Sequence, residues 1–229
     1  MIAGYRRQPL LINHFSPLTS HSLMSTRLNF LPDERFAPLR SSLKERLQKM
    51  ADLITPENFP SLLDFRSGSL LHDVFAAVRA DEGSVWILDQ AKEHLVVSYA
   101  SGPHAADIMG FKQPLSAGIV STSFISEQGF AENDVYRHEL HSRLLDEKLH
   151  VTTYAMIVAP FYILDACRGV ISCVQLINVR NEDGRSVPIE KTPGGFSMGN
   201  LDAIKRAALV LTDLINYGLL RTAIGWEAN

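Results

Sequence analysis

The pattern of apolar and polar positions predicts a series of helices and strands along the chain. Apolar residues three or four positions apart indicate amphipathic helices, and short runs rich in Val, Ile, Tyr and Phe indicate strands. Helices are expected at 38–54, 67–80, 118–124, 134–149 and 200–220, and strands at 84–88, 95–99, 155–164 and 169–179, with a further short segment at 111–115.

The order of these elements predicts an α+β fold. Two strands, a long mixed crossover and two more strands indicate a central antiparallel sheet, which we expect to have about five to six strands and to be covered by helices. A long helix is expected near each end of the domain, at 38–54 and at 200–220.

The same pattern divides the chain into four parts. Residues 1–37 have prolines and no sustained period, so we expect a flexible or partner-ordered arm. Residues 38–66 form a leading helix and linker, 67–220 the domain, and 221–229 a tail. Within the domain, the Gly- and Pro-rich stretch 180–199 is predicted to be a lid or an insert.

Composition limits the partners. The chain has 22 Lys and Arg against 25 Asp and Glu, a net charge of −3, and no dense basic block, so nucleic acid is not an expected partner. No run approaches the roughly 20 uninterrupted apolar residues that span a bilayer, so we expect a cytoplasmic chain that does not insert into a membrane.

Several phrases of the sequence, spread over a hundred residues, resemble those of one family. The runs 118–120, 127–130 and 133–135 resemble the crossover of GAF domains, where a glycine-led helix is followed by a turn and an acidic-tipped segment. The runs 152–160 and 169–178 resemble the two C-terminal strands of that family, with their Ala-Pro and Gly-Val-Ile phrases.

The resemblance covers about residues 67–220 and implies a GAF-like, profilin-like fold. It also implies a small ligand between the sheet and the crossover, or a role in dimerisation and relay. Polar residues on the segments expected to surround such a ligand are the candidate binding residues. They are Ser121, Ser123, Asp134, Tyr136, Thr153, Tyr154 and Gln175.

Gln175 is the most informative of these candidates. It lies among Val174, Leu176 and Ile177, where an unpaired amide would cost about 1 to 3 kcal/mol. We therefore expect Gln175 either to contact the ligand or to bond to neighbouring backbone.

A metal site receives little support. Asp134, His138 and His141 would share one face of the predicted helix 134–149, and His150 would add a fourth donor. A solvated charged face explains the same pattern better, so no metal ligand is assigned and the cofactor is left unnamed, with a haem or iron site as a minor alternative.

Cyclic-nucleotide binding is a second minor alternative. The resemblance implies a signature of Asn-Lys, a later Phe, and Asp-Glu three residues beyond it. Asn178 and Phe196 match this signature, but Val179 replaces the lysine, and the pair Asn200-Leu201 replaces Asp-Glu. Arg180 could supply part of the missing positive charge.

The resemblance argues against an enzyme. The family includes a free methionine sulfoxide reductase whose catalysis depends on several cysteines in the crossover and strands, whereas this chain has only Cys167 and Cys173. No Gly-rich phosphate loop or HExxH motif is present either. We therefore predict no catalytic residues, with a thiol enzyme that uses Cys173 as the weakest alternative.

Two hypotheses remain for the function. In the first, a sensory module binds a small molecule, dimerises through its terminal helices and signals to a separate output protein. In the second, an adaptor without ligand only holds a dimer or recruits a partner. Bulky side chains should then plug the adaptor's cavity, and the candidates are Trp86, Phe111, Met156 and Phe161.

Overall fold

A computed structural model describes residues 34–180, 183, 185–189 and 192–226. The chain divides into two units, Met1–Pro38 and Leu39–Asn229, and the fold belongs to the second. Nearly all of the predicted arm 1–37, and residues 227–229 of the predicted tail, lie outside the described residues.

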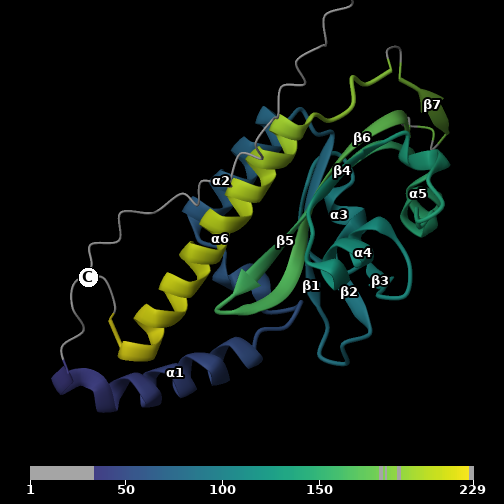
Figure 1. Ribbon diagram of the computed structural model, residues 1–229. Coiled ribbons are helices and arrows are strands. Elements are labelled where there is room, and N and C mark those ends of the chain that lie inside the picture. The colour runs from purple at the N-terminus through teal and green to yellow at the C-terminus, as the bar shows by residue number, and fades with distance from the viewer. Residues whose placement is uncertain (1–33, 181–182, 184, 190–191, 227–229) are drawn as a thin grey trace, which may run out of the picture. The chain divides into compact units, whose positions relative to one another are not determined.

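A single antiparallel sheet organises the second unit (Figure 1). Its strands lie in the order β3-β2-β1-β6-β5-β4, and β7 pairs with the far end of β6. The bounds are β1 Glu82–Leu88, β2 His94–Ser101, β3 Lys112–Pro114, β4 Phe130–Asn133, β5 Thr152–Ile163, β6 Ala166–Arg180 and β7 Ser186–Pro188. The predicted antiparallel α+β architecture is confirmed.

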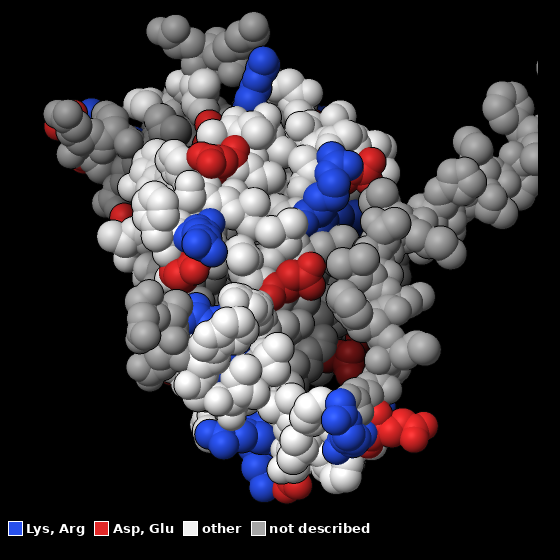
Figure 2. Space-filling view, turned by 90° about the vertical axis from the view of Figure 1, so that its left-hand side faces the viewer, with Lys and Arg blue, Asp and Glu red and all other residues white. Residues whose placement is uncertain are grey.

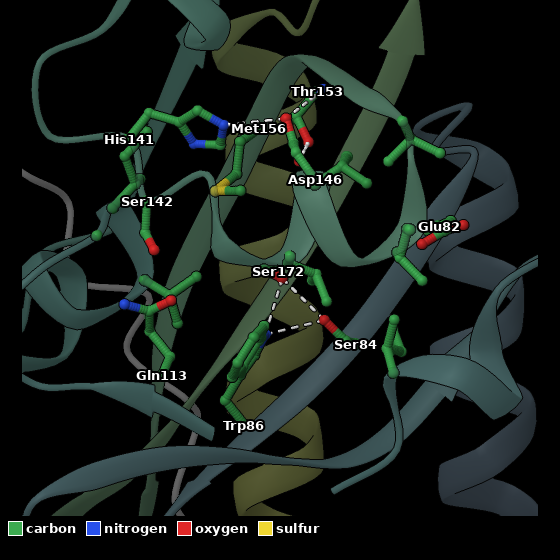
Figure 3. A pocket seen from close by; sticks show the side chains of 18 of the residues that line it. Glu82, Ser84, Trp86, Gln113, His141, Ser142, Asp146, Thr153, Met156 and Ser172 are labelled. Atoms are coloured by element: carbon green, nitrogen blue, oxygen red, sulfur yellow. Dashed lines mark hydrogen bonds and ion pairs between the residues drawn. The ribbon is translucent and has the colours of Figure 1, made fainter. Parts of the chain in front are cut away.

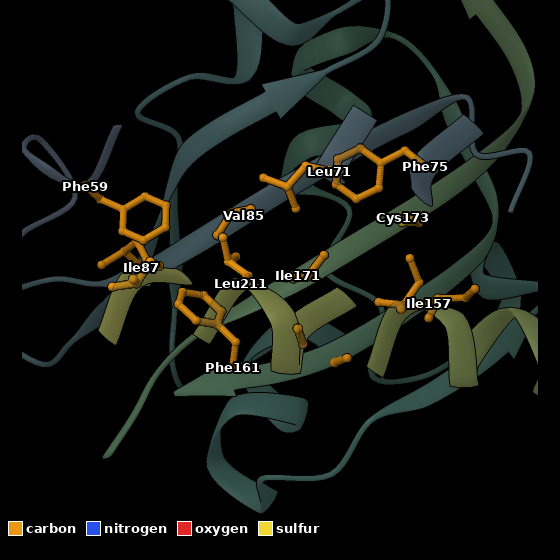
Figure 4. Packing of buried hydrophobic residues seen from close by; sticks show 14 of the residues in the cluster. Phe59, Leu71, Phe75, Val85, Ile87, Ile157, Phe161, Ile171, Cys173 and Leu211 are labelled. Atoms are coloured by element: carbon orange, nitrogen blue, oxygen red, sulfur yellow. The ribbon is translucent and has the colours of Figure 1, made fainter. Parts of the chain in front are cut away.

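One face of the sheet is covered by the long helix α6, Met198–Ile224, and by α2, Phe65–Ala77 (Figure 1). Side chains from β1, β5 and β6 meet both helices in the larger hydrophobic cluster, which includes Phe161, Ile171 and Leu211 (Figure 4). The short helix η2, Phe59–Leu62, and the end of α1, Ala37–Asp52, close this cluster through Phe59 and Ala51.

Two polar side chains on α6 accept hydrogen bonds from the backbone on this face of the sheet. Thr212 Oγ1 accepts the backbone N–H of Tyr162 (3.2 Å), and Asn216 Oδ1 accepts that of Leu164 (2.8 Å). The strand β4 is too short to pair with this end of β5, so the helix satisfies backbone donors that the sheet leaves open.

The crossover covers the opposite face (Figure 1). It contains α3, Ala105–Ile108; α4, Ile119–Ser126; η3, Val135–Arg137; and α5, Leu144–Leu149. These elements pack on a second hydrophobic cluster that includes Trp86, Val158 and Val170.

Bulges in the sheet decide which side chains face the crossover. Thr153 pairs with Leu176 and Ala155 with Gln175, so Tyr154 is an extra residue in β5. Residues 153 and 155 would share a face in a regular strand, but the bulge places Thr153 towards the crossover and Ala155 in the α6 cluster.

Several predicted boundaries are corrected, two of them at helix starts. Helix α2 begins at Phe65 instead of residue 67, because Asp64 caps it: Asp64 Oδ1 accepts the backbone N–H of Ser67 (2.9 Å). Ser197 begins α6 in a capping box with Asn200, and the helix continues to Ile224, through the first four residues of the predicted tail.

The crossover and the 180–199 stretch also differ from prediction. The expected helix 134–149 is two short pieces, η3 and α5, because residues 138–143 follow an irregular path between them. Strand β4 forms at 130–133, where neither a helix nor a strand was expected, and the 180–199 stretch contributes β7.

Truncation of a buried aromatic residue should lower stability much more than truncation of an exposed one. Phe161 is fully buried with its ring 5.9 Å from that of Phe59, whereas Phe65 is 90% exposed. We expect Phe161→Ala to lower the free energy of unfolding by about 3 to 5 kcal/mol, and Phe65→Ala by less than about 0.5 kcal/mol. Denaturant unfolding measures both, and equal losses would contradict the core assignment.

Candidate functional site

A cavity of about 60 Å³ lies between the sheet and the crossover (Figure 3). Strands β1, β5 and β6 supply one wall, and α4, α5 and the segment before α5 supply the other. Its apolar lining includes Ile108, Ile119, Val120, Leu145, Leu149 and Val174. The space can hold on the order of four water-sized molecules.

Three hydrogen-bonded side chains form a polar patch on the strand wall. Trp86 Nε1–H donates to both Ser84 Oγ (2.9 Å) and Ser172 Oγ (3.0 Å), and the two hydroxyls lie 2.9 Å apart (Figure 3). Ser84 and Trp86 alternate on β1 opposite Ser172 and Val170 on β6, so strand periodicity brings these side chains to one face.

The crossover is fixed to the sheet through the carboxylate of Asp146. Thr153 donates its hydroxyl to Oδ1 (2.7 Å) and its backbone N–H to Oδ2 (2.9 Å), and His141 Nε2 lies 3.1 Å from Oδ2 (Figure 3). All three residues line the cavity. His141 and Asp146 also line a more open hollow of about 480 Å³ beside it, so they form the partition between the two spaces.

Gln113 lies at the start of the crossover wall and is only 4% exposed. Its Nε2 donates to Ala117 O (2.8 Å), and no described group donates to its Oε1. A Cβ on Gly118 would lie 3.1 Å from Gln113 and 3.2 Å from Ser142, and Gly118 has φ +97°. Glycine at position 118 therefore allows the chain to adopt this conformation and allows Gln113 and Ser142 to pack closely against it.

A buried acid reaches the cavity from the start of β1. Glu82 Oε1 pairs closely with His104 Nδ1, and both side chains are at most 10% exposed. Burial raises the pKa of Glu82, although the hydrogen bond and the charge of His104 act to lower it.

Comparison with known proteins shows the fold. The sequence matches no family model and no curated protein. The GAF-B domain of DevS from Mycobacterium smegmatis aligns at TM-score 0.50 and 15% identity, over 68% of this chain and 94% of that domain. The GAF domain of the phosphoenolpyruvate-protein phosphotransferase ptsP from Coxiella burnetii aligns at TM-score 0.50 and 13% identity, over 81% and 97%.

This chain has the GAF fold. The resemblance seen in the crossover and in the last two strands is thereby confirmed at the level of fold.

A third similar structure corrects the prediction that the chain is not an enzyme. Free methionine-R-sulfoxide reductase from Neisseria meningitidis, solved in complex with its substrate, aligns at TM-score 0.51 and 16% identity, over 86% of this chain and 98% of that one. The prediction rested on the small number of cysteines and on the lack of known catalytic motifs, and these absences do not exclude catalysis by a chain whose fold also serves an enzyme.

The two cysteines of this chain lie away from the cavity. Cys173 is fully buried in the α6 cluster, on the opposite face of β6 from Ser172, and burial raises the pKa of its thiol. Burial, with the nearby charge of Glu127, raises the pKa of Cys167 to about 11. Neither thiol has the lowered pKa that favours a reactive thiolate.

Among the seven predicted binding residues, Thr153 lines the cavity. Tyr136 lines the open hollow beside it and stacks on Tyr154, with ring centroids 6.4 Å apart. Tyr154 packs against the α6 cluster, because it is the bulge residue of β5. Asp134 is exposed in a left-handed conformation before η3.

The other three candidates bond to backbone. Ser121 donates to Pro114 O (2.8 Å) and Ser123 to Gln128 O (2.7 Å), so both hydroxyls stabilise the ends of the α4 segment. Gln175 donates to Arg79 O and accepts from Gly195 N–H, both at 3.1 Å. Its amide thus has the backbone partners that were considered as the alternative to a ligand.

Sequence reasoning missed most of the polar lining. Ser84 and Ser172 had one local signal available, namely a small polar residue inside a strand that is otherwise apolar, whereas Gln113 and Asp146 had no signal of this kind. A buried strand residue that is polar needs a partner, and this rule could have singled out Ser84 and Ser172.

The metal hypothesis loses its geometric basis. It required a helix through residues 134–149, but His138 Nδ1 accepts the backbone N–H of Leu140 and His141 pairs with Asp146. Within the described part of the chain, no three His, Cys, Asp or Glu side chains are grouped to hold a metal ion.

The raised pKa of Glu82 predicts a pH effect on stability. Glu82 binds its proton more tightly in the folded state than in the unfolded state. The stabilisation that this difference provides is fully present below the ordinary pKa of 4.5 and is lost as the pH rises through the raised pKa of the folded state. In that window we expect wild type to lose stability relative to Glu82→Gln, as measured by urea unfolding at several pH values. Exposed Glu93→Gln is the control, and a difference between wild type and Glu82→Gln that does not change with pH would refute the assignment.

Proposed function

We propose that the chain is a GAF sensory module that binds a small molecule in the cavity and transmits its occupancy to helix α6. The observation that carries this proposal is the polar lining of a buried space. Gln113 Oε1 and one hydroxyl proton of the Ser84–Ser172 pair have no hydrogen-bond partner among the described residues. Polar groups that face a cavity and keep unused hydrogen-bonding capacity are available to a ligand.

The size of the cavity favours a ligand of few atoms. A space of about 60 Å³ accommodates on the order of four or five non-hydrogen atoms. A cyclic nucleotide is several times larger. The sequence signature of nucleotide-binding members is also incomplete, and Phe196 is buried in the α6 cluster on the other face of the sheet.

The bulky residues expected of a plugged adaptor leave this cavity open. Trp86 and Met156 line it without filling it, and Phe111 packs edge-on against Trp86 with ring centroids 6.2 Å apart. Phe161 lies on the opposite face. This arrangement supports the sensor over the adaptor.

Strand β6 connects the cavity with α6, because its successive side chains point to opposite faces of the sheet. Ser172 and Val174 of β6 line the cavity, whereas their neighbours Ile171 and Cys173 pack in the α6 cluster. A ligand that shifts β6 therefore changes the surface on which α6 lies, and two packings of α6 with different ligand affinity would constitute the signal.

Helix α6 also offers a surface for a second copy of the chain. Its outward side exposes Leu209, Val210, Tyr217 and Ile224 among charged residues. Figure 2 shows this side of the molecule, where acidic and basic side chains are scattered over a largely uncharged surface. We propose that α6, together with α1, forms a homodimer interface.

Filling the cavity should abolish retention of a ligand. Ile119 lines the cavity and Ile125, in the same helix, is 65% exposed. Ile119→Phe adds about three heavy atoms and should cost about 1 to 3 kcal/mol of stability while displacing the ligand. We expect native mass spectrometry to find a small adduct on wild type and on Ile125→Phe, and none on Ile119→Phe. An adduct retained by Ile119→Phe would place the ligand elsewhere.

A charge on α6 should dissociate the dimer. Val210→Asp places a carboxylate at the centre of the proposed interface, and we expect a cost of about 2 kcal/mol, or roughly thirtyfold in the dimer dissociation constant. Sedimentation equilibrium measures this constant. Leu140→Asp is the matched control, because Leu140 is exposed in the crossover. Equal dissociation of both variants, or a monomeric wild type, would reject the interface.

A further inference from the structure

Two amide side chains hold the segment that leads into α6, near β4 (Figure 1). Asn133 ends β4; its Oδ1 accepts the backbone N–H of Phe196 (2.8 Å), and its Nδ2 donates to Phe196 O (3.2 Å). Gln175 Oε1 accepts the N–H of Gly195 (3.1 Å). Ser197, the next residue, caps α6. The two amides therefore fix the two residues directly before the cap of the helix.

The contact between Asn133 and this segment is close and specific. The N–H of Phe196 can only donate and its carbonyl can only accept, so these partners fix the orientation of the Asn133 amide. Gly195 has φ +74°, and a Cβ there would lie 2.6 Å from Asn133 Oδ1. The side chain of Phe196 is buried in the α6 cluster. A movement of Asn133 is thus transmitted to a residue that packs under the helix.

Asn133 is also joined to the crossover. Asp134, which follows it, turns the chain with φ +58°, and Val135 is fully buried in the second hydrophobic cluster. Ile119 and Leu149 belong to the same cluster and line the cavity. An occupant of the cavity that displaces Ile119 or Leu149 therefore acts on the cluster that holds Val135, two residues from Asn133.

Gln175 forms the more permanent of the two contacts. It lies on β6 between Val174 and Leu176, which line the cavity, and its Nε2 donates to Arg79 O (3.1 Å) just after α2. Gln175 is buried, whereas Asn133 is exposed. Water can replace the hydrogen bonds of an exposed amide at little cost, but a buried amide that loses its partners is destabilising. Asn133 is therefore the contact that can open.

We infer that Asn133 is the residue through which the crossover controls the start of α6. Occupancy of the cavity displaces the end of β4, separates the Asn133 amide from Phe196 and loosens the first turn of the helix. The inference rests on the proposed function and adds to it a second connection between cavity and α6, besides the one through β6.

A double-mutant cycle read by hydrogen exchange tests the inference without a ligand. Ile119→Phe fills the cavity from the crossover wall, and Ile125→Phe makes the same change at an exposed position of α4. Asn133→Ala removes both bonds to Phe196. Asn216→Ala is the matched control, because Asn216 Oδ1 accepts a different backbone N–H, that of Leu164.

All proteins are unfolded in urea, dialysed and refolded, and native mass spectrometry confirms that none carries a small molecule. Exchange of the backbone amides 196–201 is then measured by mass spectrometry. We expect Ile119→Phe to speed this exchange about fivefold in the wild-type background, and Ile125→Phe to leave it unchanged. In the Asn133→Ala background the effect of Ile119→Phe should fall below about twofold, whereas it should persist with Asn216→Ala.

A purely structural role of Asn133 predicts a different result. The effect of Ile119→Phe would then be equally large with and without Asn133, and that result would overturn the inference. Unchanged exchange in Ile119→Phe itself would overturn it too. If a variant does not fold, Val120→Leu enlarges the same wall by less, and Asn133→Asp keeps the side-chain shape while it removes the donor to Phe196 O.

The proposed function is decided separately, by the adduct on the protein as purified. Loss of the coupling at Asn133 in a protein that carries an adduct would overturn only this inference. Coupling at Asn133 in a protein that is purified without any adduct would support the inference about Asn133 and count against the proposed ligand.

Discussion

The structure depends on the central position of β6, which pairs with β1 on one side and β5 on the other. Because successive side chains of a strand point to opposite faces, one strand supplies both layers of the protein. Ile171 and Cys173 belong to the core under α6, and Ser172 and Val174 line the cavity. Gly169 allows this close pairing, since a Cβ there would lie 2.1 Å from Trp86 O.

A polar interaction of comparable importance holds the crossover in place. Asp146 accepts three donors from Thr153 and His141, and it thereby fixes α5 to the first residues of β5. The bulge at Tyr154 is what directs Thr153 towards this carboxylate. Sheet geometry and crossover position are therefore linked through one residue, and together they create the space that we assign to a ligand.

The sequence was sufficient to predict the fold and most of its elements, because apolar periodicity is strong in β5, β6 and α6. It was insufficient for the crossover, where short elements such as α3, η3 and β4 have too few residues for a period to appear. Helix α6 was predicted well in its interior, whereas its start depended on a capping box between Ser197 and Asn200.

Prediction of the site was poorer for a physical reason. Candidates were chosen as polar residues on the expected segments, but Ser121, Ser123 and Gln175 satisfy backbone groups. The lining residues depend on pairing across strands, as between Ser84 and Ser172, and on a bulge. These features relate residues 88 positions apart, and no local pattern specifies them.

The central claim is that the space between sheet and crossover is a ligand site whose open polar atoms include Gln113 Oε1 and a hydroxyl of the Ser84–Ser172 pair. A high-resolution crystal structure of the protein as purified tests it most directly. The account predicts electron density for a small molecule within hydrogen-bond distance of both groups. A cavity closed by the side chains of its own lining, with Gln113 Oε1 bonded within the protein, would contradict it.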